Sequence, residues 1–220
     1  MNITKTITLA YAFILAAASS YASLTTTAGY YDKRIASGAY DVDGAAFLNT
    51  SATLELPLPL MVGFEYVADD NYFVDGWIGT QIGNLSVAFI MTAFEVGNTD
   101  YEVAASYDFS FGPIADVSLG VSFTDAEPGG GVDKLVTIPS FTISKEIGLF
   151  DGKLGVLGGL QYGRSIGLDE NYGFLLGFAR LSVNLTEDLS VFGHGSYLKN
   201  DLTLNNDWDA SYYGGVSYTF

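Results

Sequence analysis

The chain has no cysteine, only one histidine, and few basic residues: 9 Lys and Arg stand against 25 Asp and Glu. The absence of cysteine excludes disulfide scaffolds and Cys-based zinc or redox sites. A single histidine excludes multi-His metal sites and most His-based catalytic sites. The net charge of −16 argues against binding to nucleic acid, because phosphate neutralisation requires clustered Lys and Arg.

Long hydrophobic runs are also scarce. The run over residues 7–18 holds about a dozen apolar residues, whereas a membrane-spanning helix needs roughly 20, and no other stretch reaches that length. Lys5 precedes it, and Ser20, Tyr21 and Ala22 follow as a small-x-small site. This arrangement predicts a cleaved secretory signal peptide over residues 1–22 and a single domain over residues 23–220. Any membrane crossing by that domain must use strands.

Hydrophobic residues are nevertheless abundant, at 49% of the chain, and they alternate with small or polar ones. The clearest case is residues 101–111, where Tyr, Val, Ala and Phe share one face and Glu102, Asp108 and serines share the other. Residues 115–124 and 208–220 repeat the pattern. A period of two residues predicts β-strands with one polar and one apolar face.

The connections between these segments fall into two alternating kinds. Five are short and nearly uncharged, such as Gly83-Asn84 and Gly112-Pro113, and six are longer and acidic, including the stretch around Asp41 and Asp43. Short turns on one side and long loops on the other predict an all-β, antiparallel up-and-down transmembrane β-barrel of 12 strands. Because residues 31–40 alternate poorly, a count of 10 strands remains open.

Two features predict that the apolar face points outward, toward lipid. Many apolar strands end in an aromatic residue, as interfacial girdles do, and strands of about ten residues match a tilted crossing of the hydrocarbon layer. The aromatic ends are Tyr66, Tyr72, Tyr101, Phe111, Phe123, Tyr172, Tyr197 and Trp208. The polar face would then line the lumen.

The last segment, residues 212–220, alternates aromatic and small residues and ends on Phe220. It resembles the C-terminal signature of bacterial outer-membrane β-barrel proteins, and the size resembles a small porin-like member. The resemblance implies location in the outer membrane of a Gram-negative bacterium. It also implies contact with outer-membrane lipid and lipopolysaccharide, and recognition of the final strand by the barrel-assembly machinery. It indicates no particular family, solute or oligomeric state.

The predicted lumen face collects charged side chains among small residues. The candidate pore-lining residues are Glu65, Asp75, Glu102, Asp108, Asp116 and Arg180. Charges on a pore wall tune ion selectivity, so we expect passive diffusion of ions or small solutes with a preference for cations. Trp77, Phe174, Phe178 and Tyr213 also fall on this face. A packed, non-conducting barrel whose acidic external loops make surface contacts is therefore the alternative function.

Catalysis is not expected, and the sequence indicates no cofactor and no metal site. His194 and Ser196 form a His-x-Ser pair, which is similar to that of outer-membrane phospholipase and lipid A deacylase. Those enzymes continue with Asn where Tyr197 stands here, and they place the pair on the lipid side, whereas this pair falls on the lumen face. An outer-membrane lipid hydrolase is accordingly the third hypothesis for the function, after the porin and the non-conducting barrel.

Overall fold

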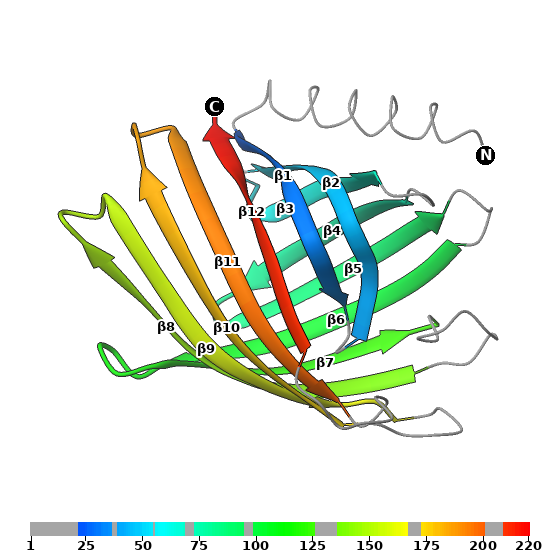
Figure 1. The fold of residues 1–220 in the computed structure, drawn as a ribbon. Coiled ribbons are helices and arrows are strands. Elements are labelled where there is room, and N and C mark those ends of the chain that lie inside the picture. The colour runs from blue at the N-terminus through cyan, green and yellow to red at the C-terminus, as the bar shows by residue number, and fades with distance from the viewer. Residues whose placement is uncertain are drawn as a thin grey trace.

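The computed structural model describes residues 22–36, 39–54, 56–68, 73–94, 99–125, 136–166, 173–200 and 209–220. They form one closed antiparallel barrel in which each strand pairs with the next along the chain and β12 pairs with β1 (Figure 1). The predicted 12-stranded barrel is confirmed. The strands are β1 Ala22–Ala36, β2 Ala39–Leu54, β3 Leu60–Ala68, β4 Phe73–Ile82, β5 Leu85–Phe94, β6 Thr99–Ser110, β7 Asp116–Thr124, β8 Val136–Leu149, β9 Leu154–Arg164, β10 Gly173–Asn184, β11 Leu189–Asn200 and β12 Asp209–Thr219.

Across these ranges, no helix is long and apolar enough to cross a membrane. The predicted signal peptide lies almost wholly outside the described residues, which begin at Ala22.

The seam between β1 and β12 closes the barrel. Seven residue pairs run from Thr25 opposite Thr219 to Tyr31 opposite Tyr213. The Phe220 N–H donates to the Leu24 carbonyl at 2.8 Å, so the last residue is part of the seam. The final strand therefore removes the free edges that an open sheet would leave.

The short turns lie together at one end of the barrel, and the chain ends there as well (Figure 1). Gly83 and Gly112 begin two of these turns with φ of 60° and 61°, in the left-handed region that glycine tolerates best. A glycine at the first of two central residues suits the type II′ hairpin turn that Gly83 and Asn84 form. These positions explain why the turns can be so short.

The first hairpin corrects the predicted strand ends. The sequence suggests a long acidic loop around Asp41 and Asp43, but β2 already begins at Ala39, and the backbone of Asp43 pairs with Lys33. Backbone hydrogen bonding does not require apolar side chains, so an acidic stretch can still form a strand. A register shift between Arg34 and Ile35 accommodates the irregular stretch. Within that stretch, residues 31–36 and 39–40 belong to β1 and β2, so the 10-strand alternative is wrong.

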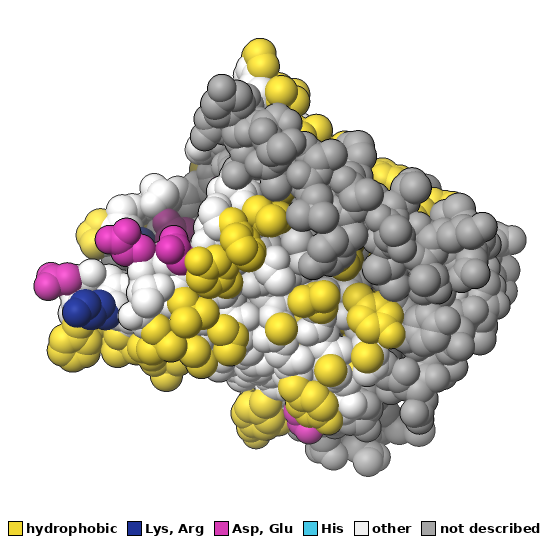
Figure 2. Space-filling view, turned by 90° about the horizontal axis from the view of Figure 1, so that it is seen from above, with side chains coloured by type: hydrophobic (Ala, Val, Ile, Leu, Met, Phe, Trp, Pro, Cys, Tyr) yellow, Lys and Arg dark blue, Asp and Glu magenta, His cyan; other side chains and the backbone are white. Residues whose placement is uncertain are grey.

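Alternation along the strands sorts the side chains into two sets. The outward set is rich in exposed aromatic and aliphatic residues, such as Val103, Tyr107 and Phe123. Figure 2, which looks down on the view of Figure 1, shows hydrophobic side chains over much of the described surface and fewer charged ones. The exposed set is thus the apolar one, which is the arrangement of a barrel in lipid and the reverse of a soluble barrel.

Two apolar clusters lie on the inward side, toward the end with the long loops. One joins Tyr31, Ala45, Phe47, Val67, Phe73 and Phe192, and the other joins Val136, Ile138, Phe174 and Leu198. On the outward side of β2 and β3, a smaller cluster joins Ala52, Val62 and Phe64. The inner wall is therefore apolar in places near the end with the long loops and polar elsewhere.

Candidate functional site in the barrel lumen

All six predicted pore-lining residues occupy inward positions in the register of the strands. Glu65 on β3 stands opposite Asp75 on β4, and Asp75 stands opposite Thr92 on β5. The set continues with Glu102 and Asp108 on β6, Asp116 on β7, and Arg180 on β10. The register brings most of the carboxylates to one side of the barrel and leaves Arg180 on another.

Glu65 and Asp75 are buried against the wall. The hydroxyl of Tyr31 donates to Glu65 Oε2 at 3.2 Å, and the amide of Asn49 donates to the same oxygen at 3.3 Å. The hydroxyl of Thr92 donates to Asp75 Oδ1 at 2.6 Å. These hydrogen bonds satisfy oxygen atoms of the two carboxyl groups, which would otherwise be costly to bury.

Glu102 and Asp108 lie on the same strand and are only partly buried. Ser122 on β7 hydrogen-bonds to the Glu102 carboxylate, and Asp108 stands opposite Ser118. Within the described ranges, neither carboxylate has a cation as its partner. These two residues therefore present negative charge to the lumen most directly.

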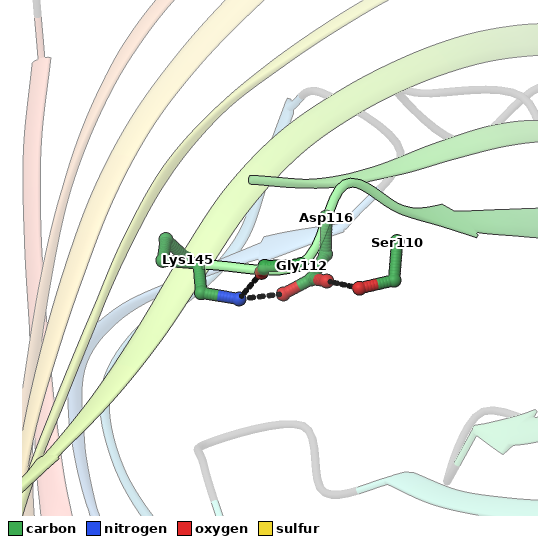
Figure 3. A network of polar contacts seen from close by, with 4 residues as sticks. All are labelled: Ser110, Gly112, Asp116 and Lys145. Carbon is green, nitrogen blue, oxygen red and sulfur yellow. Dashed lines mark hydrogen bonds and ion pairs between the residues drawn. The ribbon is translucent and has the colours of Figure 1, made fainter. Parts of the chain in front are cut away.

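Asp116 differs from the others because it begins β7 at the rim. It accepts a hydrogen bond from the Ser110 hydroxyl at 2.6 Å and one from Lys145 Nζ at 3.2 Å (Figure 3). Lys145 also donates to the Gly112 carbonyl at 2.6 Å. This network connects β8 to the β6–β7 turn and offsets the charge of Asp116. Asp116 therefore contributes less negative charge to the lumen than its position in the sequence suggests.

Two inward carboxylates were missed in the sequence. Asp100 extends the inward row of β6, and Glu146 continues the inward row of β8. Simple alternation with Glu102 and with Ser144 could have found both. Among the side chains that the structure describes, every inward carboxylate lies on β3, β4 or β6–β8, whereas β10 and β11 carry Arg180 and His194.

Aromatic rings follow one another across five neighbouring strands on the opposite side. Ring centroids are 6.0 Å apart between Phe178 and His194, 4.4 Å between His194 and Tyr213, 5.2 Å between Tyr213 and Tyr31, and 4.4 Å between Tyr31 and Phe47. We call these five residues the aromatic belt. Such spacings are typical of favourable ring contacts.

Four inward rings lie over glycines that pair with them directly in register. Trp77 covers Gly63, Phe47 covers Gly29, Phe178 covers Gly159, and Phe174 covers Gly163. In each pair the ring occupies the space that a Cβ atom would need. The predicted inward direction of Trp77, Phe174 and Phe178 agrees with these contacts. Because glycine leaves this space, the rings lie along the wall and extend less into the lumen.

His194 and Ser196 both point inward, as predicted, and not toward lipid. His194 is stacked between Phe178 and Tyr213, and its Nδ1 atom has no hydrogen-bond partner among the described residues. A catalytic histidine needs a group that orients it, and the described surroundings supply none. The same ranges contain no group of three His, Asp or Glu side chains placed to hold a metal ion.

The sequence matches no protein-family model, and no curated protein sequence aligns with it significantly. Solved structures do match. The KdgM porin gives a TM-score of 0.59 at 11% identity, over 90% of this chain and 99% of that chain. An outer-membrane channel from Pseudomonas putida F1 gives 0.56 at 11% identity, over 91% and 96%. A bacterial polysaccharide outer-membrane secretin gives 0.51 at 10% identity, over 91% and 98%. The chain thus has the fold of outer-membrane porins and channels.

Proposed function

We propose that the protein is a small outer-membrane porin through which ions and small solutes diffuse, with a preference for cations. The observation that carries the proposal is the inward acidic surface of β3, β4 and β6–β8, where Glu102 and Asp108 have no described cation as partner. Carboxylates on a pore wall attract cations and repel anions. The rings packed over glycines support an open lumen, because they reduce the obstruction that inward aromatic residues would cause.

The charge of the lumen also bears on the kind of solute. The KdgM porin has been solved in complex with disordered oligogalacturonate, a chain of acidic sugars. The inward surface of the present chain carries many carboxylates and, among its described side chains, Arg180 as the fixed positive charge. Similar charges repel one another, so we infer that this protein disfavours polyanionic solutes.

The remaining parts of the proposal concern how the protein reaches its membrane. We infer export through a cleaved signal peptide at residues 1–22, insertion by the barrel-assembly machinery acting on β12, and contact with lipopolysaccharide. A barrel that folds into the membrane but conducts no ions would favour the rival function, a structural or surface-contact role for the acidic loops.

The selectivity is tested by the reversal potential across a planar bilayer that separates two KCl concentrations. We expect the wild-type barrel to pass K⁺ in preference to Cl⁻. The double variant Glu102→Gln/Asp108→Asn removes two lumen charges without changing side-chain size, so the permeability ratio should move toward that of a neutral pore. Glu187→Gln, in an exposed turn, removes one charge outside the lumen and should leave the ratio unchanged. An anion preference in the wild type would refute the proposal.

A further inference from the structure

A hollow of about 470 Å³ lies inside the barrel near the β8–β9 and β10–β11 turns. Its wall includes Glu146 from β8, Arg180, Ser182 and Asn184 from β10, and Ser190 from β11. A volume of several hundred Å³ is in the range of sites for small molecules. The lining combines one negative group, one positive group, hydroxyls and an amide.

The two charged groups face the same hollow without neutralising each other. Glu146 stands opposite Leu157, which stands opposite Arg180, so one strand separates them. Two strand spacings place their Cα atoms about 9–10 Å apart. In the part of the chain that the structure describes, neither side chain forms an ion pair.

Phe192 orients the positive charge, and Gly155 keeps the hollow open. The Arg180 guanidinium lies 4.3 Å from the centroid of the Phe192 ring, a cation–π contact that orients it and leaves its N–H groups available. A Cβ atom at Gly155 would lie 2.5 Å from Ser182 Oγ and 3.4 Å from Glu146 Oε1. A side chain at Gly155 would therefore fill the space between Ser182 and Glu146.

We propose that this hollow binds a small zwitterionic solute, an amino acid or a short peptide, on its way through the lumen. The solute's carboxylate would accept hydrogen bonds from Arg180, and its ammonium group would donate to Glu146. A simple anion would be repelled by Glu146 and a simple cation by Arg180, whereas a zwitterion satisfies both charges. The inference rests on the proposed function, since it takes the lumen to be a diffusion path.

Binding is tested on the barrel purified in detergent, with glycylglycine as the probe and titration calorimetry or saturation-transfer NMR as the measurement. N-acetylglycine carries only the carboxylate, and glycinamide carries only the ammonium group. We expect glycylglycine to bind more tightly than either. Glu146→Gln and Arg180→Gln should each weaken its binding by roughly ten- to a hundredfold, the equivalent of one lost hydrogen bond to a charged group.

The exchange variant Glu146→Arg/Arg180→Glu should recover much of the binding that the single changes remove, because both charges are again present. Glu187→Gln, which lies outside the hollow, should bind as the wild type does. Equal binding of the three probes, or no binding of glycylglycine, would overturn the inference. A barrel that conducts ions but does not bind glycylglycine contradicts the zwitterion site alone. A barrel that binds it but does not conduct supports the site and contradicts the porin function.

Discussion

Replacing Gly163 with alanine is expected to lower the ion conductance of the barrel. The new Cβ would occupy the place of the Phe174 ring, and ring atoms are the nearest neighbours at that position. The ring must then swing away from the wall, toward the lumen. Overpacking of this kind costs about 1–3 kcal/mol of stability. Single-channel recording in a planar bilayer measures the conductance, and resistance to urea unfolding measures the stability.

The double variant Gly163→Ala/Phe174→Ala shows whether a lower conductance comes from a narrowed lumen or from a misfolded barrel. Without the ring, the added methyl group has room, and the conductance should return to the wild-type value or exceed it. Gly193→Ala is the matched control, because a Cβ there meets no atom within 4 Å. If Gly163→Ala conducts as well as the wild type while remaining folded, the packing of rings on glycines does not set the width of the lumen.

Deleting Phe220 is expected to reduce the amount of assembled barrel in the outer membrane far more than it reduces stability in vitro. The deletion removes one backbone hydrogen bond to Leu24 and a ring contact with Tyr218 at 4.7 Å. Together these amount to about 1–3 kcal/mol. The recognition of the terminal aromatic residue by the assembly machinery that we propose would add a requirement that exists only in the cell. Heat-modifiable mobility on a detergent gel measures the folded fraction in both settings.

Phe111→Ala provides the comparison for this prediction. Phe111 is also exposed, at 58%, at the end of an aromatic strand near a short turn, but it lies far from the C-terminus. We expect its loss to leave assembly in the cell nearly unchanged. Equal effects of the two changes in the cell would contradict a special role for the terminal residue.

The sequence predicts most of the architecture because the alternation and the turns are local signals. Residues 101–111 show a two-faced strand, and β6 spans Thr99–Ser110. The turn at Gly83 and Asn84 falls where the glycine predicts it. The predicted strand ends of the first hairpin are wrong because the local signal is missing there. The stretch around Asp41 has no clear alternation, and its place in the sheet depends on pairing with β1.

In the lumen too, local patterns predict some features, and pairing between strands decides the others. Alternation is enough to place Glu65, Asp75, Glu102, Asp108, Asp116 and Arg180 inward. It cannot show that Lys145 offsets Asp116, because these residues meet only when β7 and β8 are in register. The pairing of Phe174 with Gly163 and of Trp77 with Gly63 also depends on register between strands. Whether an inward ring blocks the lumen is therefore decided by its partner on the next strand.

Whether the lumen conducts ions is measured by recording from the purified barrel in a planar bilayer, with the same KCl solution on both sides. We expect discrete current steps as single barrels insert, from protein whose mobility on a detergent gel shows that it is folded. Folded, heat-modifiable protein that inserts into the bilayer and gives no steps would contradict a conducting lumen.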